Sequence, residues 1–250
     1  MSGHSKWATI KRKKAVTDSK RGKVFTQVIK EITIAARMGG GDPKGNPRLR
    51  LAIEKAKSVN MPADNIKRGI QKGTGELPGV VYEDMTYEGY GPGGVALIIE
   101  SVTDNKNRTV SEIRHLFDRH NGKMGATNSV AYMFHKKGVI NVSKVNNSED
   151  ELLSVILDAG ADDMRTDEDV FEIVTTPENF ERVRQTLESK GIAMELAEIQ
   201  MIPENTVSVA GKEAEMVLKL VETLEDHDDV QHVYANFDID EKVMASLNAG

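Results

Sequence analysis

Apolar residues in the first third of the chain recur at intervals of three and four, which is the spacing of one helix face. One such stripe runs over 25–36 and is interrupted by three consecutive glycines at 39–41. A second helix is predicted to begin after Asn46, whose side chain can cap it, and a third to span 62–73, with Gly73 as its C-cap. The pattern therefore predicts three short helices that bury their apolar stripes against one another.

Beyond residue 75 the periodicity changes to alternating strands and helices. The segment 73–79 contains three glycines and a proline and is predicted to be a linker. A Gly-Pro-Gly-Gly turn at 91–94 then separates two apolar-rich runs, which is the signal of a β-hairpin. Further strands are expected near 131–134, 139–142, 171–174, 194–199, 207–209 and 230–237, with helices over 107–120, 148–160, 176–187 and 217–224 between them.

Helices that separate paired strands are typical of an α+β fold, in which helices cover one face of a sheet. We therefore predict three domains, namely an N-terminal three-helix domain and two ferredoxin-like α+β domains. The helical domain is expected over 1–75. The expected α+β domains are one over 80–135 plus 203–240 and, inserted into it, a second over 136–202.

The composition is that of a soluble globular protein. Hydrophobic residues make up 39% of the 250 residues, and no stretch approaches the roughly 20 consecutive apolar residues of a membrane span. The absence of cysteine excludes disulfides, thiolate nucleophiles and cysteine-ligated metal sites. We therefore expect a cytoplasmic protein that does not associate with a membrane.

Charge is divided unevenly along the chain. The net charge of −6 is the sum of +13 over residues 1–75, which hold 18 Lys and Arg against 5 Asp and Glu, and of −19 over the remainder, which holds 15 cations against 34 acids. Such a split favours a basic module that binds a polyanion, beside an acidic part that does not. The acidic domains are then expected to hold the geometry or to bind a protein partner.

The basic excess starts in an arm over 1–23 and continues onto the predicted helices, where a merely solvated tail would not need it. Lys and Arg neutralise phosphates and release counterions, so we interpret this region as a nucleic-acid-binding surface. Arg48 and Arg50 start the second helix, whose free amide groups also favour anions. The predicted phosphate-binding residues are Lys6, Lys11, Arg12, Lys13, Lys14, Lys20, Arg21, Lys23, Arg48, Arg50, Lys67 and Arg68.

Motifs for catalysis, cofactors and metals are missing from the sequence. The glycine runs at 39–41 and 91–94 form neither a dinucleotide fingerprint nor a P-loop, and neither His-Glu-x-x-His nor Gly-x-Ser-x-Gly occurs. The acid clusters at 162–169 and 225–229 lack the order of a calcium loop and are expected to be solvated turns. We therefore predict no catalytic residue, no cofactor, no metal site and no enzymatic activity.

A polar run over 103–109 precedes the helix expected at 107–120. Thr103 or Asn105 is predicted to cap that helix. Two cations, Lys106 and Arg108, lie at the same helix start, where they oppose the helix dipole. Their position therefore requires a partner.

Several long motifs resemble those of the YebC/PmpR family, and together they span essentially the whole chain. Lys106 stands where the family usually has arginine. The motifs are Met-Ser-Gly-His-Ser-Lys-Trp at the start, Asn-Pro-Arg-Leu-Arg-Leu-Ala at 46–52, Tyr-Glu-Gly-Tyr-Gly-Pro-Gly-Gly at 87–94, Thr-Asp-Asn-Lys-Asn-Arg-Thr at 103–109 and Ser-Val-Ala-Tyr-Met-Phe at 129–134.

This resemblance implies a three-domain fold and a function without catalysis. Bacterial members are described as DNA-binding transcriptional regulators, relatives in mitochondria are translational activators, and some bacterial members are linked to ribosomes that stall on proline-rich sequences. We accordingly expect a transcriptional regulator that binds the phosphate backbone of DNA. The alternative is a translation factor that binds rRNA on the ribosome.

The sequence offers no device for reading bases. Neither a clear recognition helix nor an aromatic sheet of the RRM kind is predicted. Contacts to the backbone are therefore favoured over sequence-specific readout with either nucleic acid. We expect the protein to be a monomer.

Overall fold

The computed structural model describes residues 18–167 and 169–240. Three helices form its N-terminal part, and they pack through the apolar stripes that the sequence shows. Asn46 caps the second of them, because its Oδ1 accepts the backbone N–H of Leu49 at 3.1 Å. The helices are α2 (Asp18–Gly39), α3 (Pro47–Ser58) and α4 (Ala63–Thr74).

The predicted end of α4 differs from the observed one. The C-cap is Gly75, whose φ of 84° is left-handed, whereas Gly73 still lies within the helix. Gly73 serves a different purpose, because α4 crosses α2 there and a Cβ atom would meet the carbonyl oxygen of Thr33. The glycine therefore permits close helix packing and does not end the helix.

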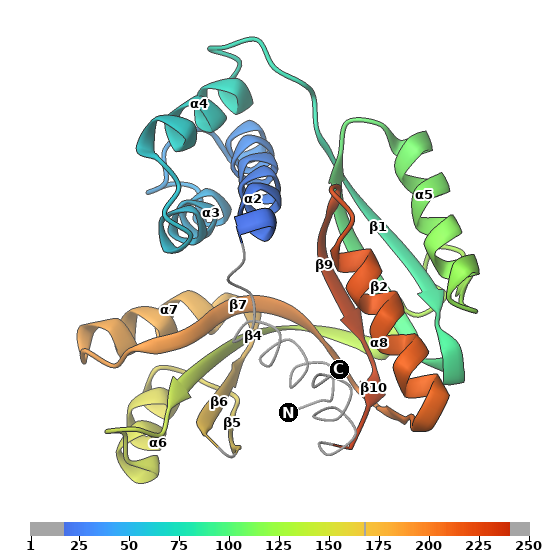
Figure 1. Cartoon of the computed structure of the whole chain (residues 1–250). Coiled ribbons are helices and arrows are strands. Elements are labelled where there is room, and N and C mark those ends of the chain that lie inside the picture. The colour runs from blue at the N-terminus through green and yellow to red at the C-terminus, as the bar shows by residue number, and fades with distance from the viewer. Residues whose placement is uncertain (1–17, 168, 241–250) are drawn as a thin grey trace.

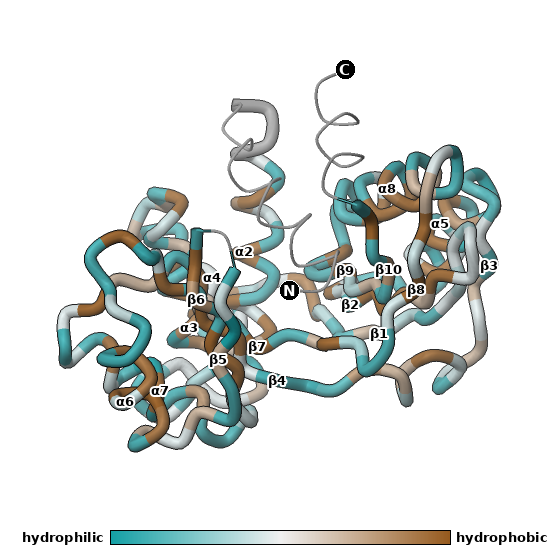
Figure 2. The backbone as a smooth tube through the Cα atoms, turned by 90° about the horizontal axis from the view of Figure 1, so that it is seen from below, coloured by the Kyte–Doolittle hydropathy of each residue, from teal (hydrophilic) through white to brown (hydrophobic). Residues whose placement is uncertain are grey.

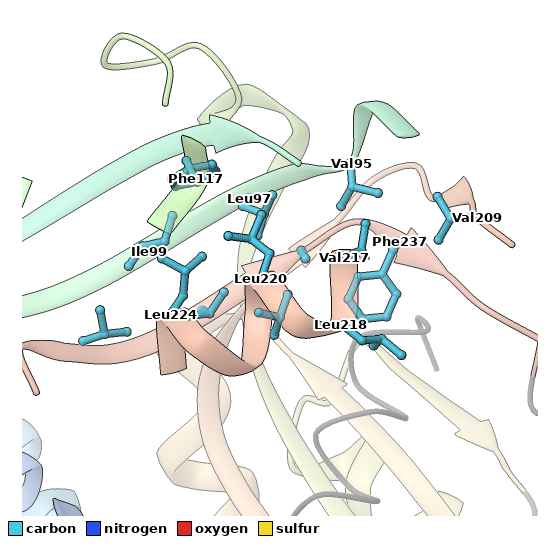
Figure 3. Close-up of a cluster of buried hydrophobic side chains, with 14 of the residues drawn as sticks. Val95, Leu97, Ile99, Phe117, Val209, Val217, Leu218, Leu220, Leu224 and Phe237 are labelled. Carbon is cyan, nitrogen blue, oxygen red and sulfur yellow. The ribbon is translucent and has the colours of Figure 1, made fainter. Parts of the chain in front are cut away.

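A first antiparallel sheet follows the helical domain. Helices α5 (Lys106–Arg119) and α8 (Gly211–Glu225) lie on one face of this sheet, and Figure 3 shows leucine side chains of α8 directed at β2. The sheet has the strand order β3-β1-β2-β9, and its strands are β1 (Glu83–Tyr90), β2 (Ala96–Thr103), β3 (Lys123–Met124) and β9 (Val230–Ala235).

The second sheet is built from the segment between residues 134 and 203. Its chain order is strand, helix, strand, strand, helix, strand, and its sheet order is β5-β6-β4-β7 with antiparallel neighbours. This is the ferredoxin-like arrangement. Its elements are β4 (Phe134–Ser143), α6 (Glu149–Asp158), β5 (Asp163–Thr166), β6 (Val170–Thr175), α7 (Pro177–Ser189) and β7 (Met194–Pro203).

These elements confirm the predicted α+β fold with an N-terminal helical region. The first sheet has the hairpin strands β1 and β2 at its centre, so its strand order is not the ferredoxin-like one that was predicted for it. The second sheet has the ferredoxin-like order. A short parallel pair, β8 (Val207–Ser208) and β10 (Phe237–Asp238), follows the first sheet, and Val207 and Phe237 of this pair pack in the core of that sheet.

Two local predictions were wrong for identifiable reasons. The expected strand at 131–134 is a 3₁₀ turn, η2 (Ala131–Met133), because a buried carboxylate binds backbone N–H groups there that a strand would need. The acidic stretch expected as a loop contains β5, an edge strand whose only apolar residue is Met164.

Figure 1 shows how the three parts are arranged. The helical domain lies beside the first sheet and above the second, and the long strands β4 and β7 run from one sheet to the other. Figure 2 shows that β4 is hydrophilic where it crosses between them. The first half of this strand contains His135, Lys136 and Lys137. The helical domain is therefore in a position to contact both α+β domains.

Candidate nucleic-acid interface

The predicted phosphate-binding residues fall into three groups. Lys20 and Arg21 belong to the first turns of α2. The structure shows the side-chain environment of a second group, which consists of Lys23, Arg48, Arg50, Lys67 and Arg68. The arm residues lie outside the described residues, and they are Lys6, Lys11, Arg12, Lys13 and Lys14.

Helix α2 docks its cations on the turn that precedes β9. Lys23 Nζ lies 3.4 Å from Asp226, and Gln27 Nε2 donates to the carbonyl oxygen of Val230 at 2.7 Å. Lys30 is 8% exposed, and its Nζ lies 2.6 Å from Asp229 Oδ1 and 2.9 Å from the carbonyl oxygen of Asp228. These contacts fix the helical domain to the first α+β domain.

Asp229 is the centre of this junction. It is only 2% exposed, and its Oδ2 accepts from Arg108 at 2.8 Å and from the Thr109 hydroxyl at 2.7 Å, with Thr103 Oγ1 at 3.1 Å. Burial by itself would raise the pKa of Asp229, but the hydrogen bonds from Lys30, Thr109 and Arg108 outweigh it and hold that pKa well below its ordinary value.

The polar run at 103–109 is explained by this junction. Asn105 caps α5 by accepting the N–H of Arg108 at 3.1 Å, as predicted. Arg108 then reaches Asp229 and also Asp104, at 2.9 Å, while Lys106 lies 2.6 Å from Glu83. The two cations that oppose the helix dipole are therefore held by acids of neighbouring elements.

One group of described residues has the spacing of a metal site. Ligand atoms of Glu112, His227 and Asp229 lie within 4.8 Å of one another, and His227 Nε2 is 2.9 Å from Glu112. Both oxygens of Asp229 already face Lys30 and Arg108, and His227 Nδ1 accepts the N–H of Asp229 at 3.1 Å. The charges of this group are thus balanced by protein cations, so we interpret it as an internal network and not as a metal site.

Arg48 joins the helical domain to β1. Its guanidinium lies 2.6 Å from Glu31 Oε1 and 2.9 Å from Glu31 Oε2, and it also contacts both oxygens of Asp84 at 2.8 Å. The hydrogen bonds to Asp84 and Glu31 raise the pKa of Arg48 despite its partial burial. A phosphate would have to displace two carboxylates to bind here.

Arg50 faces the second α+β domain. Its Nη2 lies 3.2 Å from Glu181 of α7, and Leu51 next to it packs against the core of that domain. In the same interface Arg184 is 6% exposed and its Nη1 lies 3.2 Å from Glu54 of α3. Helix α3 therefore contacts the second α+β domain while α2 contacts the first.

The cations of the helical domain consequently separate into two kinds. Of the ten between residues 24 and 75, Lys30, Arg48 and Arg50 pair with acids and Arg37 donates to the carbonyl oxygen of Tyr82 at 3.2 Å. The other six are exposed and have no ion-pair partner among the described residues, and they are Lys44, Lys55, Lys57, Lys67, Arg68 and Lys72.

Helix α4 carries the densest group of these exposed cations. Its inner face holds Ile66 and Ile70, which pack on the helical core, so Lys67, Arg68 and Lys72 point to solvent. Lys72 also borders a hollow of about 320 Å³ between α2, α4 and the linker. This face, defined by Lys67, Arg68 and Lys72, is called the α4 cation face below.

Comparison with known proteins covers almost the whole chain. Residues 5–76 match the family model described as "TACO1/YebC protein N-terminal domain", and residues 82–237 match "TACO1/YebC second and third domain". None of the helices in the described part of the chain combines the length and the apolar character needed to cross a membrane.

Similar proteins and a similar crystal structure are known. A probable transcriptional regulatory protein of Chlorobium phaeobacteroides is 55% identical over 99% of this chain and 100% of its own length. One from Desulfotalea psychrophila is 57% identical over 99% of both chains. The crystal structure of a conserved hypothetical protein from Aquifex aeolicus is 47% identical, has a TM-score of 0.83, and covers 92% of this chain and 95% of its own.

Proposed function

Since this chain belongs to the TACO1/YebC family, whose members named above are probable transcriptional regulatory proteins, we propose that it is a non-enzymatic transcriptional regulator that binds duplex DNA in the cytoplasm. Its helical domain contacts the phosphate backbone, and the two α+β domains hold that domain in place. The α4 cation face carries this proposal, because exposed cations without acid partners are what a polyanion requires.

The proposed contact is to phosphates and not to bases. The arm residues Lys6, Lys11, Arg12, Lys13 and Lys14 are proposed to add phosphate contacts, and Lys20 and Arg21 follow them in the sequence, in α2. Lys23, Arg48 and Arg50 contribute to the positive potential of the domain while they hold its position. Binding of this kind is nearly independent of sequence and falls steeply with salt.

The α4 cation face provides the first test. Replacing Lys67, Arg68 and Lys72 together with alanine is expected to weaken binding to random and promoter duplexes alike, because a phosphate without its lysine or arginine keeps its condensed counterions. The plot of log affinity against log salt concentration should become less steep, by roughly 0.9 in the magnitude of its negative slope for each phosphate that is no longer neutralised. Fluorescence anisotropy titrations at several salt concentrations measure both quantities.

A matched control separates this surface from net charge. Lys190, Lys212 and Lys219 are exposed cations of the acidic domains without an ion pair among the described residues. Replacing these three with alanine changes the net charge of the chain equally, and it should leave the salt slope unchanged. Equal losses of affinity in the two triple variants would refute the assignment of the surface.

The arm provides a second test. Replacing Lys11, Arg12, Lys13 and Lys14 with alanine is expected to weaken duplex binding for many sequences alike, because these side chains are proposed to neutralise phosphates. The salt slope should flatten by roughly 0.9 for every phosphate that the arm neutralises in the wild type. Unchanged affinity and slope in salt titrations of this variant would show that the arm does not touch the nucleic acid.

The same cation surface also suits an RNA helix, so the target is decided by competition. Wild-type protein is incubated with ribosomes and duplex DNA at two salt concentrations, and the fraction that sediments with ribosomes is measured. The proposal predicts that duplex DNA releases the protein from ribosomes. Retention on ribosomes in excess DNA would instead support the RNA-binding translation factor.

A further inference from the structure

The loop at 125–133 crosses the face of the first sheet that α5 and α8 leave open. Val130 is fully buried there and packs with Ala96 and Ile98 of β2. The neighbouring β2 residues Leu97 and Ile99 point to the opposite face, into the core with the two helices. The loop therefore replaces a helix layer on this side of the sheet.

A buried carboxylate fixes the backbone of this loop. Glu88 is 4% exposed, and its two oxygens accept the N–H groups of Asn128, Val130 and Ala131 at 2.7, 2.7 and 2.8 Å. These hydrogen bonds lower the pKa of Glu88, although its desolvation acts in the opposite direction. Charge-assisted hydrogen bonds of this kind hold the loop in one conformation.

The fixed loop presents one aromatic ring to solvent. Tyr132 is 68% exposed, and among the described residues it is the one aromatic side chain that belongs to the exposed large apolar groups. Its neighbour Tyr90 donates a hydrogen bond to the carbonyl oxygen of Ser129 at 3.0 Å. Desolvation and then the charge of Tyr132 raise the pKa of Tyr90.

A lysine leaves the sheet on the same face. Lys123 of β3 pairs in register with Tyr90 of β1, and paired residues of an antiparallel ladder direct their side chains to the same side. Lys123 is exposed and has no ion-pair partner among the described residues. An exposed ring and a free cation therefore flank Tyr90.

We propose that Tyr132 stacks on an unpaired nucleobase and that Lys123 neutralises a phosphate of the same strand. This inference rests on the proposed nucleic-acid binding and adds a second contact, outside the helical domain. A ring combined with a cation suits a single strand, because stacking on an aromatic side chain needs a base that is free on one side. The bases of an intact duplex are stacked on both sides and exclude the ring.

The test compares binding of a single strand and of a duplex by the full chain. The probes are a single-stranded oligonucleotide of about 16 nucleotides and a blunt duplex of the same sequence. Tyr132→Ala should weaken binding to the single strand by roughly 5- to 150-fold, which corresponds to the loss of one stacked base. Its duplex affinity should not change, and Tyr132→Phe should bind both probes like the wild type.

Salt dependence distinguishes the two side chains. Tyr132→Ala should leave the salt slope for the single strand unchanged, because stacking releases no counterions. Lys123→Ala should make that salt dependence less steep, by about 0.7 in the magnitude of the slope. Lys219→Ala is the matched control, since Lys219 is an exposed lysine on α8.

The possible outcomes separate this inference from the proposed function. If the wild type binds duplex and Tyr132→Ala binds the single strand as well as the wild type does, the stacking site is refuted and the regulator proposal stands. That result would also be expected if the ring served a protein partner. Equal losses of affinity for both probes would refute a selective stacking site, and a wild type that binds neither probe would refute both proposals.

Discussion

Replacing Asp229 with alanine is expected to lower the free energy of unfolding by about 3–5 kcal/mol, the usual cost of removing one partner of a buried ion pair. Asp229 is 2% exposed and Lys30 is 8% exposed, so water cannot substitute for the missing carboxylate. The variant leaves Lys30 and Arg108 facing each other's charge across a cavity. The midpoint and slope of urea-induced unfolding at pH 7 measure the change.

The control for this prediction lies three residues away. Asp226 also pairs with the helical domain, through Lys23 at 3.4 Å, but its side chain is 53% exposed. Exposed ion pairs contribute only about 0–1 kcal/mol, so Asp226→Ala should have a small effect. If the two alanine variants lose equal stability, Asp229 is not the centre of the junction.

Asp229 also makes the stability depend on acid. Its folded-state pKa is depressed, so its contribution is fully present above the unfolded pKa of about 3.9 and is lost as the pH falls through the lower folded value. Wild-type protein should therefore lose stability below about pH 4 through this group. Asp229→Asn cannot titrate, so the difference in unfolding free energy between the two proteins should shrink as the pH falls.

Local features of the helices could be predicted because their causes are close in sequence. Asn46 and Asn105 each cap a helix by accepting an N–H group three residues later, as predicted. The apolar stripes of the helical domain likewise pack as the spacing predicts. Elements with few apolar residues, such as β5, gave no such signal.

The split of the cations into paired and exposed ones could not be predicted. Arg48 pairs with Asp84, 36 residues further along the chain, and Lys30 pairs with Asp229, 199 residues away. Composition shows only that a cation is present, and tertiary structure decides whether an acid is opposite. The signal that did exist was Arg108 at a helix start, because a cation that opposes the helix dipole implies an acidic neighbour.

The buried carboxylate of Glu88 had no sequence signal either. It lies in β1 among other acidic and polar residues of that strand, and its acceptors are satisfied by backbone groups 40 or more residues later. Backbone N–H groups have no side-chain identity, so no pairing of residue types could reveal the contact. Glu88 nevertheless determines where Tyr132 lies.

Replacing Glu88 with alanine is expected to cost about 3 kcal/mol of unfolding free energy, because three N–H groups at 128, 130 and 131 lose their acceptor, the one at 130 in a buried site and the other two in half-buried ones. Glu88→Gln keeps one carbonyl acceptor and should lose less. Glu83→Ala on the same strand is the control, since its pair with Lys106 is exposed and contributes about 0–1 kcal/mol.

The position of the Glu88 carboxylate connects stability to the proposed stacking site. A loop released by Glu88→Ala no longer holds Tyr132 in one place, so single-strand affinity should fall as it does in Tyr132→Ala, while duplex affinity is retained by the helical domain. Urea unfolding and titrations of both oligonucleotides on the same preparations measure this. An alanine variant with reduced stability but wild-type single-strand binding would show that the fixed loop is structural and that Tyr132 does not depend on it.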